Sequence, residues 1–101
     1  MREKEFAVRL AELRENKGVS ARDMSLSMGQ NPGYINNIES GKSLPSLPGL
    51  FYICEYLGIS PMEFFDTKNN NPTKSKELLE AAKNLSSEQL EHLIAIAKGL
   101  K

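Results

Sequence analysis

The stretch from Ser20 to Lys42 constrains the fold of this chain more than any other, because it predicts two short helices joined by a tight turn. Ser20 is a typical helix-start residue, and Asp23 three positions later can complete a capping box. Gly29 ends the first helix, since glycine takes up the left-handed conformation that a sharp turn needs. We therefore expect this helix over residues 21–28.

A second helix is predicted over residues 32–40. Asn31 is expected to be its N-cap and Pro32 its first residue, where the missing N–H of proline costs nothing. Ile35 and Ile38, three positions apart, give this helix an inward face. Two short helices joined in this way are typical of a helix-turn-helix, whose second helix lies in the major groove of DNA.

Three segments resemble the Xre family of lambda-repressor-like transcriptional regulators. The end of that family's recognition helix is similar to IESGK at Ile38–Lys42. Its first helix and the step into the second resemble VRLAELRENKGVS at Val8–Ser20, and its last two helices resemble LPSLPGLFYICEYLGISPMEFF at Leu44–Phe65. The resemblance covers about residues 6–66. It implies an all-α, five-helix DNA-binding domain with double-stranded DNA as its partner.

The pattern of helix starts and apolar positions also fits five helices in residues 1–66, which we expect to form the helix-turn-helix domain. Besides the two helices above, one is expected at about residues 3–17 and one at about 47–57. A capping box with a proline at its first position, Ser60 to Glu63, opens a short fifth helix. The predicted core consists of Phe6, Leu10, Leu13, Met24, Ile35, Ile38, Leu50, Ile53 and Leu57.

The remaining sequence predicts a linker at residues 67–73, TKNNNPT, and a C-terminal helical segment at residues 74–101. Residues 1–66 already suffice for a helix-turn-helix core, so the apolar residues near the C-terminus need another surface to cover them. We expect them to join two chains in a homodimer, the alternative being that they fold back on their own domain. The expected dimerisation residues are Leu90, Leu93, Ile94, Ala97 and Leu100.

Polar side chains of the second predicted helix are candidates for contacts with DNA bases. An asparagine amide can form two hydrogen bonds with adenine in the major groove. By resemblance to the Xre family, Pro32, Gly33 and Asn37 occupy base-contacting positions, although Pro32 and Gly33 supply no hydrogen-bonding side chain. The alternative is that the asparagines are simply exposed polar residues. The expected base-contacting set is Asn31, Pro32, Gly33, Tyr34, Asn36 and Asn37.

Contacts with phosphates would position the protein without reading sequence. Ser20 opens a helix, whose free N–H groups and dipole attract a phosphate. Members of the family often have a glutamine at the next position as a clamp on the DNA backbone, and Ala21 cannot take that role. The expected phosphate-binding set is Ser20, Arg22, Lys42 and Ser43. For each of these, a plain solvated side chain is the alternative.

The resemblance further implies a partly buried ion pair between Arg14 and Glu39, which would join the first helix of the domain to the end of the recognition helix. A bidentate pair between arginine and a carboxylate fixes the angle between two helices. Its role would be structural rather than catalytic.

Composition argues against several other classes of function. The 101 residues carry no net charge, and residues 1–66 contain seven Lys and Arg against nine Asp and Glu, so DNA binding would need a local positive patch. A single cysteine, Cys54, favours a reducing, cytoplasmic compartment, and no apolar run is long enough for a membrane span. With one histidine, one cysteine and no phosphate-binding loop, we expect no enzyme, metal, cofactor or small-molecule ligand.

The sequence therefore predicts a DNA-binding transcriptional regulator, and more specifically a repressor that binds a twofold operator as a dimer. The alternative is a protein-interaction module on the same fold, such as an antitoxin or the partner of a regulator. The absence of net charge and the Pro32–Gly33 pair favour that alternative.

Overall fold

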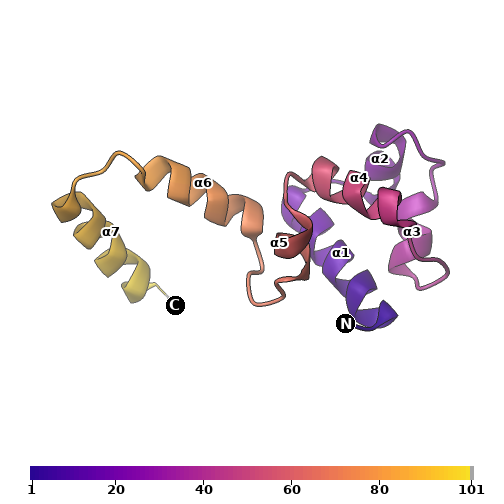
Figure 1. Cartoon of the computed structure of the whole chain (residues 1–101), viewed down its shortest axis with the longest axis horizontal. Coiled ribbons are helices and arrows are strands. Elements are labelled where there is room, and N and C mark those ends of the chain that lie inside the picture. Colours follow the sequence, from indigo (N-terminus) through magenta and orange to yellow (C-terminus); the bar gives the residue numbers. More distant parts are fainter. Residues whose placement is uncertain (101) are drawn as a thin grey trace.

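A computed structural model describes residues 1–100 of the chain and contains α-helices but no strand in that range, so the predicted all-α fold is confirmed. Lys101, the last residue of the predicted C-terminal segment, lies outside the described residues. Helices α1–α5 pack into one domain, and α6 and α7 extend away from it (Figure 1). The helices are α1 Glu3–Lys17, α2 Ala21–Ser27, α3 Tyr34–Glu39, α4 Leu47–Leu57, α5 Pro61–Phe65, α6 Pro72–Ala82 and α7 Ser87–Gly99.

The core of the domain forms where α1 lies against α3 and α4, α2 lies against α3, and α4 lies against α5. Every predicted core residue except Leu50 is buried, and Leu50 packs against the core while partly exposed. Cys54 and Ile59 are also buried, and burial raises the pKa of the Cys54 thiol. Phe64 completes the core, with its ring centroid 4.9 Å from that of Phe6.

The start of α3 differs from the prediction, which had Asn31 as the N-cap and Pro32 as the first helical residue. The helix begins at Tyr34, after a turn in which the Tyr34 N–H donates to the Asn31 carbonyl at 3.1 Å. The Asn31 side chain accepts from the Gly33 N–H at 3.0 Å. Asparagine favours such a local bond two residues on, and proline suits the second position of a turn. The local turn therefore replaces the first turn of the expected helix.

A buried arginine that the sequence analysis did not single out holds the end of α5. Arg9 is only 2% exposed, and its Nε donates to the carbonyl of Phe64 at 2.6 Å. Its Nη2 donates to the carbonyls of Glu63 and Asp66, both at 2.8 Å. The last carbonyls of a helix have no partner within the helix. The Arg9 guanidinium supplies that partner and ties α1 to α5.

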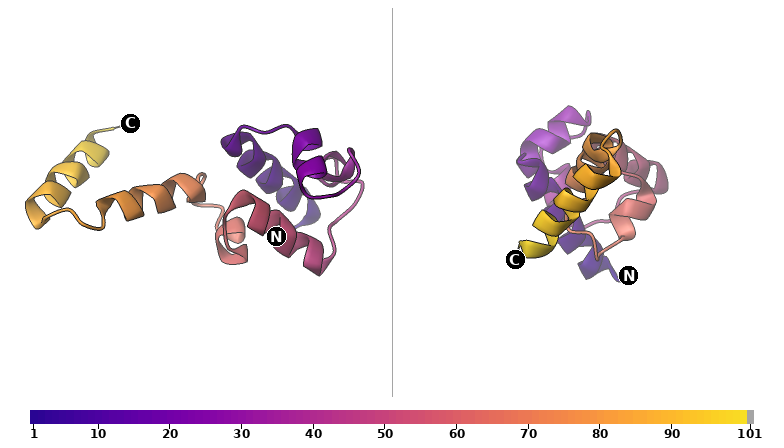
Figure 2. Two further views of the ribbon diagram at one scale, coloured as in Figure 1. Left: turned by 90° about the horizontal axis from the view of Figure 1, so that it is seen from above. Right: turned by 90° about the vertical axis from the view of Figure 1, so that its left-hand side faces the viewer.

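The segment after the domain, α6 and α7, is called the arm here. It begins at Pro72 rather than Lys74, because Asn71 caps α6 by accepting from the Lys74 N–H at 3.3 Å. The predicted linker is accordingly shorter than expected. The chain measures 50 × 25 × 22 Å with a radius of gyration of 16.3 Å, where a compact domain of this length has about 13 Å. No residue of α7 is buried, so α7 does not fold back on its own domain (Figure 2).

The start of α6 nevertheless packs against the domain and is bonded to it. Pro72 is buried, and the Thr73 hydroxyl donates to the Leu57 carbonyl at 3.3 Å. Lys76 pairs with Glu63 at 2.9 Å. The hydrogen bond from the Ser60 N–H, and then the contact with Lys76, lower the pKa of Glu63. Within residues 1–100 no helix is both long and apolar enough to cross a membrane.

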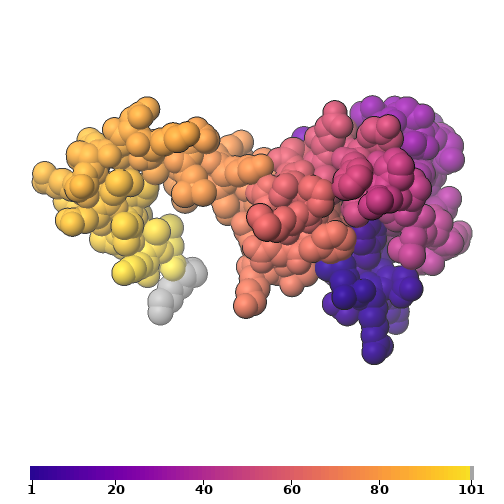
Figure 3. All heavy atoms as spheres, in the orientation of Figure 1, coloured from indigo at the N-terminus to yellow at the C-terminus, as the bar shows by residue number. Residues whose placement is uncertain are grey.

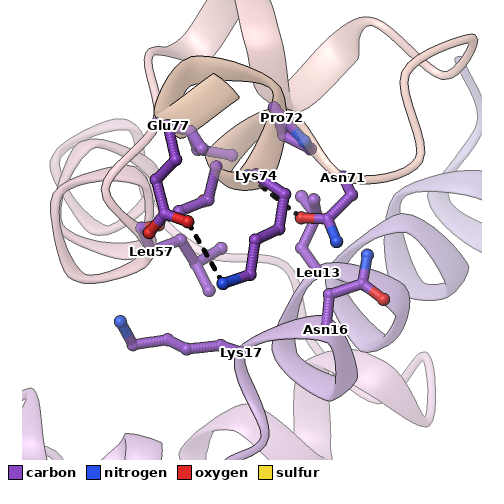
Figure 4. Close-up of a pocket in the computed structure, with 10 residues that line it drawn as sticks. Leu13, Asn16, Lys17, Leu57, Asn71, Pro72, Lys74 and Glu77 are labelled. Carbon is purple, nitrogen blue, oxygen red and sulfur yellow. Dashed lines mark hydrogen bonds and ion pairs between the residues drawn. The ribbon is translucent and has the colours of Figure 1, made fainter. Parts of the chain in front are cut away.

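A small cavity of about 190 Å³ lies beside this junction, between the end of α1 and the start of α6 (Figure 4). Leu13 and Leu57 line it together with polar side chains. Lys74 bonds Glu77 at 3.1 Å, while the Lys17 ammonium lies 5.2 Å from the centre of the Tyr56 ring. These polar groups are exposed and bonded to neighbours, so the cavity is a packing gap beside the start of α6.

Replacing Arg9 with methionine tests the bond between α1 and α5. Methionine has a similar length but no donors, so the Phe64 carbonyl would lose its partner, and the Glu63 and Asp66 carbonyls would each keep only a backbone N–H donor. We expect the free energy of unfolding, measured with urea, to fall by roughly 3–5 kcal/mol. The exposed Arg2→Met is the control and should change it by less than about 0.5 kcal/mol. Equal stability of the two variants would contradict the role assigned to Arg9.

Candidate nucleic-acid interface

Helix α3 is held against α2 by the hydroxyl of Ser25, which is completely buried. The hydroxyl donates to the Ala21 carbonyl at 2.7 Å within α2 and accepts from the Ile35 N–H at 2.9 Å. The first N–H groups of a helix lack partners within the helix, and leaving one buried and unpaired is costly. Ser25 therefore serves as a cap for α3 from a different helix and sets the angle between the two helices.

The far end of α3 is held by Arg14 of α1. Its Nε and Nη2 donate to the two carboxylate oxygens of Glu39, at 2.7 and 3.0 Å, and its Nη1 donates to the Val19 carbonyl at 2.8 Å. The side chains are 16% and 12% exposed. The hydrogen bond to Glu39 raises the pKa of Arg14 above its ordinary value. Breaking such a pair costs between the roughly 1 kcal/mol of an exposed pair and the 3–5 kcal/mol of a buried one.

Tyr34, at the start of α3, points toward α4 rather than standing free. A methyl group on Gly49 would lie 2.8 Å from the Tyr34 hydroxyl oxygen, so glycine leaves the space that this side chain occupies. Tyr34 packs against the hydrophobic core while partly exposed, and burial raises the pKa of its phenol. The sequence analysis placed Tyr34 in the base-contacting set because it considered the recognition helix alone, without the helix that crosses it.

The other residues expected to contact bases lie around α3. Asn31, Pro32 and Asn36 are exposed, and Gly33 and Asn37 are partly exposed. Gly33 has a φ of −94°, and a methyl group there would meet nothing closer than 3.6 Å. Gly33 is therefore not needed for the backbone conformation, and its surface is open. Within residues 1–100, the side chains of Asn36 and Asn37 make no hydrogen bond, so both amides are free.

The residues expected to contact phosphates flank the two helices. Ser20 is the N-cap of α2, where its hydroxyl accepts from the Asp23 N–H at 3.0 Å, and Arg22 follows in the first turn. Lys42 and Ser43 leave α3 in a turn in which both N–H groups donate to the Asn37 carbonyl, at 2.9 and 3.2 Å. All four expected residues are exposed.

Helices α2 and α3 lie at one end of the molecule, and the arm leaves from the other (Figures 1 and 2). Two short helices joined by a turn, braced inside a five-helix domain and exposed at its end, define a helix-turn-helix protein of the DNA-binding class. Among residues 1–100 there is no cluster of His, Cys, Asp and Glu that could hold a metal ion.

Comparison with known proteins identifies the family. The sequence matches the helix-turn-helix domain family over residues 7–70. The chain belongs to this family and is an Xre-type regulator, as the sequence resemblance indicated. It is similar to the crystal structure of the restriction-modification controller protein C.AhdI from Aeromonas hydrophila, with 32% identity and a TM-score of 0.58 over 62% of this chain and 91% of that one. No curated protein sequence matches the chain significantly.

Replacing Ser25 with alanine tests the brace between α2 and α3. The Ile35 N–H would stay buried without a partner, and we expect a loss of about 1–3 kcal/mol in the free energy of unfolding. Ser27→Ala is a matched control, since Ser27 lies on the same helix and is exposed. Thermal and urea unfolding of both variants measure the difference. If Ser27→Ala were destabilised as much as Ser25→Ala, the buried hydroxyl of Ser25 would contribute no more to stability than an exposed one.

Proposed function

We propose that this protein is a sequence-specific transcriptional repressor that places α3 in the DNA major groove and binds a twofold operator as a homodimer. The observation that carries the proposal is the bracing of α3 by Ser25 and Arg14, while the amides on its outer side stay free. A rigid helix with unpaired amides is what direct readout of bases requires. A repressor of this kind acts by occupying an operator and blocking polymerase.

Base readout is assigned to the amides of Asn36 and Asn37, with Asn31 at the preceding turn. Pro32 would touch a thymine methyl group, and Gly33 would let the protein backbone come close to the bases. We assign Tyr34 to positioning α3, because its hydroxyl faces Gly49 of α4. Each good bidentate contact between asparagine and adenine discriminates against a wrong base by about 1–3 kcal/mol.

Phosphate contacts are assigned to Ser20, Arg22, Lys42 and Ser43, on either side of α3. The local charge supports this assignment in spite of the neutral chain. Glu39 is neutralised by Arg14, which leaves Arg22 and Lys42 against a single acidic residue, Asp23, between Ser20 and Ser43. The surface around α3 is therefore weakly positive, and binding would fall with salt as phosphate contacts are screened.

The arm is assigned to dimerisation. Ile94 is 51% exposed and Leu100 73% exposed, and Leu90, Leu93 and Ala97 also leave apolar surface uncovered. The arm leaves the domain at the end opposite α3 (Figure 1), so a second arm can pack on it without meeting the DNA. A twofold axis that runs along the molecule toward the DNA would present both copies of α3 to one face of the duplex.

The similar protein from Aeromonas hydrophila is a restriction-modification controller. A controlling role in transcription, exerted on DNA in the cytoplasm, is proposed for this chain too. The proposal can be tested by selecting bound sites from random duplexes, where enrichment of a twofold sequence is expected. Salt-independent passage through a heparin column, with no enriched sequence, would favour a protein-interaction module on the same fold.

Two variants separate base readout from phosphate contact. Asn37→Ala should weaken binding to the selected operator by about 1–3 kcal/mol and leave binding to random DNA almost unchanged. Lys42→Ala should weaken binding to both DNAs alike and lower the slope of log K against log salt by about one. Titrations at several salt concentrations measure both. If Asn37→Ala weakened both DNAs equally, Asn37 would not contact bases.

Dimerisation through the arm can be tested in the full chain. Ile94→Glu places a charge within the apolar stripe formed by Leu90, Leu93, Ile94, Ala97 and Leu100. Its sedimentation coefficient should fall from that of a dimer toward that of a monomer. Ile96→Glu is the matched control, because Ile96 is 62% exposed on the same helix but lies to one side of the stripe. We expect the control to remain dimeric. Identical sedimentation of the two variants would argue against an arm interface.

A further inference from the structure

The start of the arm is bonded to three different helices of the domain. Asn16 of α1 donates from its Nδ2 to the Asn70 carbonyl, just before α6. The last carbonyl of α4 accepts from the Thr73 hydroxyl at 3.3 Å, and Glu63 of α5 pairs with Lys76 at 2.9 Å. These three contacts are called the joint here.

One side of the first two turns of α6 lies on the domain. Thr73 and Lys76 are three positions apart, and residues with this spacing share one side of a helix. Pro72 beside them is buried and lines the small cavity together with Leu13 and Leu57 (Figure 4). On the face shown in Figure 3, the start of the arm lies directly against the domain, while α7 stands clear of it.

Contacts with three helices restrain the direction of the arm more than one contact could. A single bond leaves α6 free to tilt and to turn, and a second bond still permits rotation about the line between the two. The third contact opposes that rotation. The domain side is itself held, since Arg9 of α1 bonds the Glu63 carbonyl. The Lys76 side chain is 54% exposed, and an exposed ion pair contributes little to stability, so the joint acts mainly on direction.

The direction of the arm determines where α3 lies, because the two are at opposite ends of the molecule (Figure 2). A domain the size of residues 1–66 is roughly 28 Å across. A tilt of about 20° at the joint would therefore move α3 by roughly 10 Å, or about three base pairs of 3.4 Å. A shift of three base pairs also turns a half-site by roughly 100° around the duplex. A free joint would thus leave the spacing of half-sites unspecified.

The apolar surface of the arm begins on the helix that the joint holds. In α6, Leu78 is 55% exposed and Leu79 is 71% exposed, and the apolar stripe of α7 follows. A second arm that packs on this surface is therefore in contact with a helix that is bonded directly to the domain.

We propose that the joint fixes the direction of the arm relative to α3 and thereby sets the spacing of the half-sites that the protein prefers. The proposal rests on the twofold dimer of the proposed function. The arms hold the two chains together, and the joint turns that contact into one placement of the two recognition helices. Asn16, Thr73 and Lys76 are accordingly positioning residues, which act on DNA recognition through the arm.

Removing all three donors from the full chain tests the joint. The three-site variant carries Asn16→Ala, Thr73→Val and Lys76→Met, and circular dichroism checks that its helices remain. In the unaltered protein, residual dipolar couplings of the backbone N–H groups should fit a single alignment for the domain and α6. In the three-site variant, the couplings of α6 should shrink by about half relative to those of the domain, because α6 then moves independently.

Lys74→Met is the matched control, because Lys74 pairs with Glu77 within α6 and not with the domain. It should leave the couplings unchanged. Thr73→Ser combined with Lys76→Arg keeps the hydroxyl and the charge and should also retain the single alignment. Separate alignments for the domain and α6 in the unaltered protein, or unchanged couplings in the three-site variant, would overturn the proposal.

Half-site spacing provides the second measurement. The unaltered protein should bind two selected half-sites at one spacing about tenfold or more tightly than at a spacing three base pairs longer. The three-site variant should lose most of this preference, and Lys74→Met should keep it. Full retention of the preference by the three-site variant would overturn the proposal. If no twofold site were enriched, the proposed function would fail instead, and the couplings would still decide whether the joint is rigid.

Discussion

The geometry of the helix-turn-helix depends on the buried hydroxyl of Ser25, which joins α2 to α3. Helix α3 has six residues, too few to be stable in isolation. Its direction therefore comes from its neighbours. Ser25 holds its first turn from α2, Arg14 holds its end from α1, and Tyr34 fills the space above Gly49 of α4. Three helices thus fix a fourth that could not form alone.

The hydrogen bonding of the arginines explains why the net charge of the chain is a poor guide to the charge on its surface. Arg9 and Arg14 form hydrogen bonds inside the domain, with carbonyls and with Glu39, so Arg22 is the exposed arginine of the helix-turn-helix. Phosphate attraction is then modest. Under the proposed function, specific binding would draw on neutral amides and on two half-sites, so the proposed dimer would contribute more to affinity here than in a strongly basic domain.

Much of the fold could be predicted because its helices carry local signals. Serines at four helix starts and glycines in the turns mark the boundaries directly. What the sequence could not supply is contact between distant segments. Arg9 was missed because its acceptors lie far away in the sequence, at the end of α5, although it shares the spacing of Phe6, Leu10 and Leu13. The start of α3 was misplaced because a local bond of Asn31 competes with capping. The contact of Tyr34 with α4 was missed because Gly49 lies in a different helix.

The side chains that form the hydrogen bonds within this domain are different from those whose amides point away from it. Ser25, Arg14 and Glu39 hold α3, while Asn36 and Asn37 take no part in the bonding of residues 1–100. Mutations at the two asparagines are therefore nearly silent for folding. If the two asparagines contact bases as proposed, substitutions there could change the DNA sequence that the protein binds while each intermediate stays folded. Duplicated copies in one genome could then diverge to separate targets without first gaining stability.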